Sequence, residues 1–101
     1  MKNILDNYQI SISKLCEDHK VKSLYAFGSV LTENFGNQSD IDLIVDFEHQ
    51  DVLDYGDNYF DLKFALEKMF NRPIDLLEEI ALKNPYFKQA IYQQRQLIYG
   101  Q

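Results

Sequence analysis

The spacing of hydrophobic residues predicts alternating helices and strands along most of the chain. Apolar side chains recur every three or four residues over 4–19 and again over 59–70, which indicates helices with one buried face. Runs rich in branched and aromatic residues predict strands at 21–27, 41–47 and 74–77. This alternation is typical of an α/β fold, in which helices flank a small sheet.

Polar and glycine-containing segments predict the connections between these elements. Gly28-Ser29 follows the first strand and predicts a tight turn into a short helix capped by Ser29. Residues 32–39 are polar and contain a glycine, as expected of a loop. Residues 48–57 are acidic and polar, and we expect them to form an exposed segment before the second long helix.

The last third of the chain is less clearly patterned. Asn71-Arg72-Pro73 ends the second long helix, because the residue before a proline disfavours helical backbone. Residues 82–94 predict a helix that is interrupted or begins near Pro85, since proline suits a first helical turn. Residues 97–99 fit either a short final strand or the end of a helix.

Composition limits the size and the location of the protein. The chain has 101 residues, of which 46% are hydrophobic and 26% charged, so we expect one ordered domain over residues 1–101. No apolar stretch has the length of a membrane span. Cys16 is the one cysteine, so no disulfide framework can form within the chain, and the reducing cytoplasm is the expected compartment.

The charge of the chain narrows its partners. The net charge is −6, and no basic face is evident in the sequence. Binding to long nucleic acids requires positive charge to neutralise phosphates, so we do not expect it here. A nucleotide remains possible if bound cations screen its phosphates.

Two aspartates at the start of the second strand suggest how such cations are held. Asp40 and Asp42 are two residues apart, so in a strand both side chains point to one face while Ile41 points to the core. Neighbouring carboxylates repel each other, and no Lys or Arg lies between Lys22 and Lys63 to neutralise them. Mg²⁺ binds one or two carboxylates and completes its coordination with phosphate and water. We therefore expect Mg²⁺ at Asp40 and Asp42.

A third acid and a serine turn extend this candidate site. Asp75 lies in an apolar strand, where a carboxylate is unusual unless it faces a cation or solvent. If the two strands pair, three carboxylates could hold two metal ions about 4 Å apart, as in phosphoryl or nucleotidyl transfer. Gly28 would let the backbone approach a phosphate, and Ser29 would add a hydroxyl and a helix start.

Each of these residues also has a simpler interpretation. Asp40 and Asp42 could be a solvated strand start with an Asx turn, and Asp75 could face water after Pro73. Gly28-Ser29 could be a turn with no ligand. Asp46 shares the face of Asp42 but lies about 13 Å farther along the strand, so we read it as solvated. The joint occurrence of the motifs favours the metal-site interpretation.

The arrangement Gly28-Ser29, ten residues, then Asp40-Ile41-Asp42, with Asp75 later, resembles the minimal nucleotidyltransferases of the DNA polymerase β-like superfamily. The resemblance covers nearly the whole chain. It implies a palm-like fold with a small mixed sheet and Mg²⁺-dependent transfer of a nucleoside monophosphate, such as AMP from ATP, to a hydroxyl. Asp40, Asp42 and Asp75 would be metal ligands, and Asp75 also a possible base. Gly28 and Ser29 would bind the phosphates.

The resemblance also implies a partner. Small members of this kind are often antitoxins that add AMP to a tyrosine of a HEPN-type RNase toxin. One alternative is an inactive relative that neutralises its toxin by contact alone, which is favoured by Leu31-Thr32-Glu33 standing where relatives often carry a basic residue. Antibiotic adenylylation is a weaker alternative, because those enzymes usually carry an added substrate domain. A homodimer or a complex of different chains is consistent with the small sheet and many aromatic residues.

Overall fold

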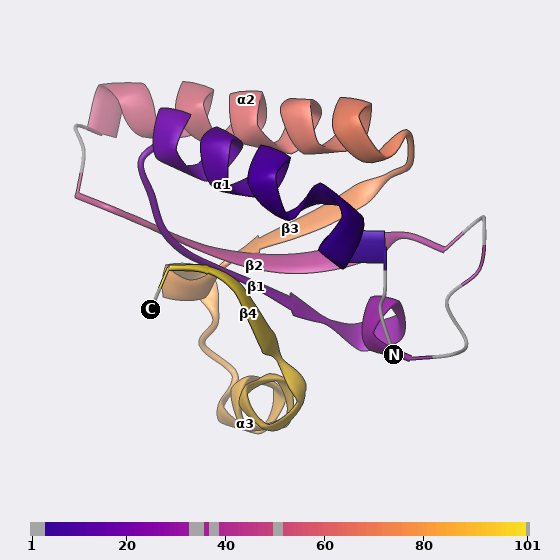
Figure 1. The fold of residues 1–101 in the computed structure, drawn as a ribbon. Coiled ribbons are helices and arrows are strands. Elements are labelled where there is room, and N and C mark those ends of the chain that lie inside the picture. Colours follow the sequence, from indigo (N-terminus) through magenta and orange to yellow (C-terminus); the bar gives the residue numbers. More distant parts are fainter. Residues whose placement is uncertain (1–3, 33–35, 37–38, 50–51, 101) are drawn as a thin grey trace.

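A mixed four-stranded sheet lies at the centre of the fold (Figure 1). The computed structural model describes residues 4–32, 36, 39–49 and 52–100. The strand order is β3-β2-β1-β4; β1 is antiparallel to both of its neighbours, while β2 and β3 are parallel. The bounds of the strands are β1 Val21–Phe27, β2 Ile41–Phe47, β3 Ile74–Glu78 and β4 Gln96–Gly100. The predicted fold class, α/β with a small mixed sheet, is confirmed.

The helices divide unequally between the two faces of this sheet. Figure 1 shows α1 and α2 side by side over one face and α3 on the other. The parallel strands β2 and β3 need a crossover connection, because a hairpin cannot join parallel strands, and α2 lies in this connection. The α-helices are α1 Gln9–Asp18, α2 Val52–Phe70 and α3 Pro85–Gln94, and the short 3₁₀ helices are η1 Ile4–Tyr8, η2 Gly28–Leu31 and η3 Glu79–Ala81.

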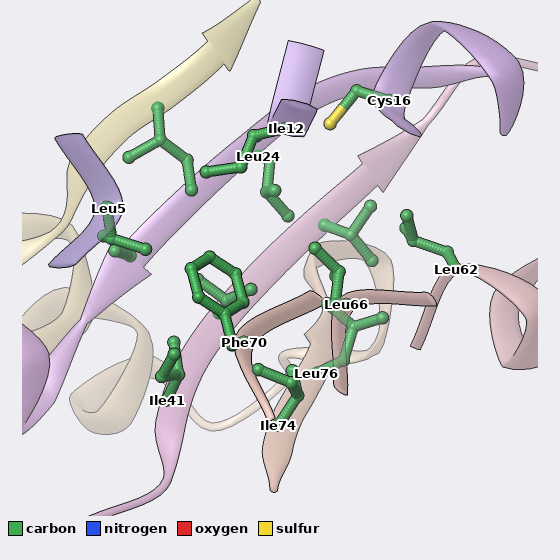
Figure 2. Packing of buried hydrophobic residues seen from close by; sticks show 14 of the residues in the cluster. Leu5, Ile12, Cys16, Leu24, Ile41, Leu62, Leu66, Phe70, Ile74 and Leu76 are labelled. Atoms are coloured by element: carbon green, nitrogen blue, oxygen red, sulfur yellow. The ribbon is translucent and has the colours of Figure 1, made fainter. Parts of the chain in front are cut away.

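The hydrophobic core lies between the sheet and the layer formed by α1 and α2. Alternate residues of β2 point into it, and Leu62, Leu66 and Phe70 on α2 meet them at a helical spacing of four residues (Figure 2). The fully buried side chains of this core include Leu5, Ile12, Cys16, Leu24, Ile41, Leu43 and Leu66. The odd-numbered residues of β2 therefore belong to this core, and the even-numbered residues lie on the opposite face of the sheet.

The opposite face is covered much less. Ile91 is the buried residue of α3. The guanidinium carbon of Arg95 lies 3.8 Å from the ring centre of Tyr25 on β1 and 4.0 Å from that of Tyr92. Arg95 Nη1 also forms an ion pair with Glu79 Oε1 at 3.0 Å. Ile44 in the middle of β2 is fully buried on this face, but Asp42 is half-buried and Asp75 is exposed, so we call this the open face of the sheet.

Most of the predicted elements are present, with one clear error. The first two strands coincide with β1 and β2, and residues 97–99 belong to a strand, β4. α2 begins at Val52, so six of the ten residues expected to form an exposed segment before this helix are helical. Asp54 in its first turn suits the positive end of the helix dipole, which explains why acidic residues do not prevent a helix there.

The start of α3 agrees with the helix start predicted near Pro85. α3 begins at Pro85, and the Asn84 side chain caps it by accepting hydrogen bonds from the backbone N–H groups of Tyr86 and Phe87 at 2.9 and 3.1 Å. Among the described residues, no helix combines the length and the apolar character needed to cross a bilayer.

Candidate active site

The candidate residues meet at one edge of the sheet because of the strand directions. β1 runs antiparallel to β2, so the end of β1 lies beside the start of β2. β3 runs parallel to β2, so the starts of these two strands also lie side by side. Gly28 follows β1, Asp40 precedes β2, and Asp75 is the second residue of β3. Segments 47 residues apart in the sequence are thus brought to one place.

Asp42 and Asp75 are direct neighbours across the parallel strands. Their Cα atoms are register partners, between the pairs Ile41–Ile74 and Leu43–Leu76. Paired residues of adjacent strands point to the same face, with backbones about 4.8 Å apart. Both carboxylates therefore lie on the open face, away from α1 and α2. Asp42 is half-buried, whereas Asp40 and Asp75 are exposed.

Gly28 lies directly against the Asp42 carboxylate. Its φ angle is +76°, which glycine adopts without strain, and a Cβ atom placed there would lie only 2.6 Å from Asp42 Oδ2. Two independent constraints, backbone angle and space, therefore favour glycine at this position. The turn after β1 and the first acidic residue of β2 form one continuous surface.

Without a bound cation, the electrostatic environment of Asp42 is unfavourable for its ionised form. Burial raises the pKa of Asp42 above its ordinary value, and the charges of Asp75 and Asp40 raise it further. Asp42 is therefore within electrostatic range of both Asp75 and Asp40. Like charges held in a partly desolvated place are costly unless a cation joins them.

The donor set fits a hard divalent cation such as Mg²⁺. Carboxylate oxygens are its preferred protein ligands, and the mutual repulsion at Asp42 would be relieved by a positive ion. Within residues 4–32, 36, 39–49 and 52–100, no three acidic, histidine or cysteine side chains are already drawn together as one metal-binding group. Mg²⁺ needs only one or two carboxylates when a phosphate supplies further oxygens, so the fit does not require a finished triad. The assignment of Asp40, Asp42 and Asp75 as ligands stays a prediction.

The turn at Ser29 differs from the predicted helix cap. Gly28–Leu31 is a 3₁₀ helix of four residues whose N-cap is Phe27, and no side chain caps it. The Ser29 carbonyl accepts hydrogen bonds from the Thr32 backbone N–H and hydroxyl, both at 2.9 Å. So short a helix has little macrodipole, so any phosphate binding by Gly28 and Ser29 would depend on local N–H and hydroxyl groups. That binding role also stays a prediction.

Lys63 and Arg72 are two basic side chains that follow Asp42 in the sequence, and they are placed differently relative to the candidate site. Lys63 lies on α2, which covers the opposite face of the sheet (Figure 1). Arg72 lies between α2 and β3, and its Nη1 donates hydrogen bonds to the carbonyls of Gly36 and Ser39, each at 3.1 Å. Thr32, which stands where the family resemblance leads us to expect a basic residue, is exposed, and the neighbouring Glu33 lies outside the described residues.

The sequence pattern did not reveal a cluster that lies on the same face of the sheet as Asp42. This Arg95 cluster consists of Tyr25, Glu79, Tyr92 and Arg95. Tyr25 pairs with Ile44 in the antiparallel ladder, two positions from the Phe27–Asp42 pair, so its ring shares the face of Asp42. Tyr92 also donates a hydrogen bond to Glu79 at 2.9 Å. Burial would raise the pKa of Glu79, but hydrogen bonds from Arg95 and Tyr92 and the positive charges of Arg95 and Lys88 together lower it below its ordinary value. These contacts join residues far apart in the chain, and no local sequence motif signals them.

Comparison with protein families gives one match that covers most of the chain. Residues 11–101 match the family described as polymerase beta, nucleotidyltransferase. Two candidate protein adenylyltransferases of Methanocaldococcus jannaschii are similar in sequence. MJ0128 is 38% identical over 86 residues, which covers 84% of this chain and 82% of the relative. MJ1379 is 34% identical over 85 residues, with the same two coverages.

Solved structures share the fold. A candidate minimal nucleotidyltransferase superimposes with a TM-score of 0.75 at 27% identity, covering 91% of this chain and 90% of the other. A toxin–antitoxin complex with AMP-PNP contains a chain with a TM-score of 0.69 at 23% identity, covering 92% of this chain and 73% of that one. A tri-AMPylated HEPN toxin of Shewanella oneidensis in complex with an MNT antitoxin gives 0.66 at 22% identity, with coverages of 97% and 74%.

Proposed function

The chain belongs to the polymerase β-type nucleotidyltransferase family, and from this premise we propose that it transfers AMP from ATP to a tyrosine of a HEPN-type RNase toxin and thereby acts as its antitoxin. The proposed place of action is the cytoplasm. The observation that carries the proposal is the meeting of Gly28, Asp42 and Asp75 at one sheet edge, with Asp42 Oδ2 against Gly28.

The proposed roles follow from the chemistry of these side chains. Asp40 and Asp42 would hold Mg²⁺ together with the triphosphate, and Asp75 would complete the acidic site. Bound Mg²⁺ would neutralise phosphate charge and polarise the reacting phosphoryl group. Gly28 leaves space for the Asp42 carboxylate, and the half-buried Ser29 could donate its hydroxyl to a phosphate oxygen.

The transfer step balances with the groups at hand. The tyrosine oxygen of the acceptor forms a bond to the α-phosphorus of ATP, and the bond from that phosphorus to the β-phosphate bridging oxygen breaks. Pyrophosphate leaves, and the phenolic proton passes to the Asp75 carboxylate, which then releases it to water. Asp75 is exposed and lies beside Asp42, so it can meet an acceptor that approaches from the open face.

A protein acceptor is favoured by two considerations. The sequence relatives at 34–38% identity are candidate protein adenylyltransferases. The open face beside Asp42 and Asp75 is bordered by α3, whose described side chains are almost all exposed, so a bulky acceptor has access to the acids. The toxin class of the acceptor is our extension from solved complexes that share this fold.

A double-label experiment tests the proposal. The purified protein is incubated with Mg²⁺, a toxin-type protein encoded beside it, and ATP labelled at either the α- or the γ-phosphate. We expect label on the toxin from α-labelled ATP alone, and its loss in Asp42→Asn. Asp46→Asn is the matched control, because Asp46 lies on the same strand and face but pairs with Ser23 away from the site.

The same experiment addresses the inactive alternative. Replacement of the usual basic residue at 31–33 favours a protein that only binds its toxin. Equal neutralisation of the toxin by wild type and Asp42→Asn, with no transferred label, would contradict the enzymatic proposal and support binding alone. Label from γ-labelled ATP would instead indicate phosphorylation.

A further inference from the structure

Arg72 connects two segments that carry the candidate metal ligands. It lies in the short link between the end of α2 and the start of β3, three residues before Asp75. Its Nη1 donates one hydrogen bond to the Gly36 carbonyl and one to the Ser39 carbonyl, each at 3.1 Å. Since Nη1 carries two hydrogens, both are used in these contacts.

These contacts end directly beside Asp40. Ser39 is the preceding residue, so the carbonyl held by Arg72 belongs to the peptide unit that leads into Asp40. Immediately after Asp40, the Ile41 N–H donates to the Pro73 carbonyl at 3.1 Å, and Pro73 is the residue that follows Arg72. Asp40 is therefore held on both sides by the link between α2 and β3.

Asp40 needs such an anchor because it lies outside the β2 ladder. β2 begins at Ile41, and the Asp40 side chain is exposed. Repulsion between the carboxylates of Asp40 and Asp42 favours conformations in which Asp40 moves away from Asp42. Hydrogen bonds from a guanidinium to carbonyls are charge-assisted and directional, so they can oppose this movement.

We propose that Arg72 is a positioning residue, which fixes the Asp40 backbone so that its carboxylate faces the same cation as Asp42 and Asp75. The idea rests on the proposed function, since it concerns the same metal site. A phosphate-binding role would have to use another guanidinium nitrogen, because both Nη1 hydrogens are engaged with the two carbonyls. It also differs from the general stabilisation of the fold, because the contacts join the link to a segment outside the sheet ladder.

Metal binding without catalysis gives the direct test. Mn²⁺ titration followed by electron paramagnetic resonance measures cation affinity, and calorimetry measures binding of a non-hydrolysable ATP analogue with and without Mg²⁺. Loss of a group that orients a metal ligand typically weakens metal affinity roughly 10- to 100-fold. We expect a loss in this range for Arg72→Ala and a smaller one for Arg72→Lys, which keeps the charge but not the fork geometry.

Backbone order gives a second readout that needs no ligand. In Arg72→Ala, hydrogen exchange at the Ser39 and Asp40 amides should become faster in the metal-free protein, while exchange within β1 stays unchanged. Lys68→Ala is the control for lost positive charge, since Lys68 is exposed on α2 over the other face. Ile12→Val is the control for reduced stability, because Ile12 is buried in the core away from the site.

The outcomes separate this inference from the proposed function. A folded Arg72→Ala protein with wild-type Mn²⁺ affinity and wild-type exchange at Asp40 would overturn the positioning role. Equal weakening of nucleotide binding with and without Mg²⁺ would also overturn it, in favour of direct phosphate contact. Failure of the wild type to transfer AMP, while Arg72→Ala still weakens Mn²⁺ binding and loosens Asp40, would reject the transferase proposal and leave the positioning role supported.

Discussion

The two faces of strand β2 show how one short segment serves two different purposes. Ile41, Leu43 and Val45 point toward α1 and α2, and all three are buried in the continuous core. Asp42 points the other way, half-buried at the strand's start and electrostatically strained by Asp75 and Asp40. The alternation of a strand thus separates stability from chemistry by one residue. Changes at neighbouring positions should therefore have opposite consequences.

The largest expected effect is the loss of transfer on changing Asp42 to Asn. The variant keeps the size of the side chain against Gly28 but removes the charge that would bind a cation. We expect the rate of AMP transfer to fall about 10³-fold, or ~4 kcal/mol in barrier, while the protein stays folded. Single-turnover transfer rates and circular dichroism measure the two properties. A variant with near-normal transfer would show that Asp42 does not bind the metal.

Leu43 to Ala should give the reverse result. Leu43 is fully buried, so its truncation removes apolar contacts and leaves a cavity in the core. A change of this kind costs about 2–5 kcal/mol of unfolding free energy, which urea denaturation can measure. Transfer per folded molecule should remain near the wild-type rate at low temperature. A selective loss of transfer, with stability unchanged, would contradict the division between the two faces.

How well the sequence predicts each face of the sheet depends on how far apart in the chain the interacting residues are. Periodicity over a few residues is enough for β1 and β2, because alternate burial is a local property of the chain. The start of α2 at Val52 was missed, since an acidic helical turn looks like a polar loop without its tertiary context. Core-facing positions follow from the same alternation.

The site is only partly predictable for the same reason. The motif correctly indicated that Asp42 and Asp75 lie together, and the parallel register shows how. The need for glycine at position 28 comes from the Asp42 carboxylate, which occupies the space of a side chain there. The bonds from Arg72 to Gly36 and Ser39 span 36 and 33 residues, beyond any local pattern. The predicted Ser29 cap was wrong because the helix already begins at Gly28.

A smaller effect, which tests the border between turn and strand, is expected from Gly28 to Ala. The positive φ angle alone costs about 1–2 kcal/mol for a residue with a Cβ atom. The new methyl group would also push Asp42 Oδ2 aside, so the rate of AMP transfer by the folded protein should fall in addition to the loss of unfolding free energy.

Gly56 to Ala is the matched control for this substitution. Gly56 lies within α2, and no atom lies within 4 Å of an added Cβ. Alanine there should raise the unfolding free energy by about 0.5–1 kcal/mol and leave transfer unchanged. Equal losses of transfer in both variants would contradict the specific contact between Gly28 and Asp42.

The smallest expected effect concerns stability at different pH values in the absence of metal. The pKa of Asp42 is raised in the folded protein by burial and by the neighbouring acids, so the folded state binds a proton there more tightly than the unfolded chain does. This contribution to stability is complete below the ordinary carboxyl pKa of about 4 and is lost as the pH rises through the raised value. At pH 7 the ionised Asp42 therefore destabilises the fold, and Asp42 to Asn should raise the melting temperature in EDTA. The difference should shrink as the pH falls from 7 toward 4, and Mg²⁺ should raise the melting temperature of the wild type more than that of the variant.

Asp46 to Asn controls for the loss of one negative charge from β2. If both variants gained equally at pH 7, the strain would belong to the net charge of the chain and not to the site that Asp42 shares with Asp40 and Asp75.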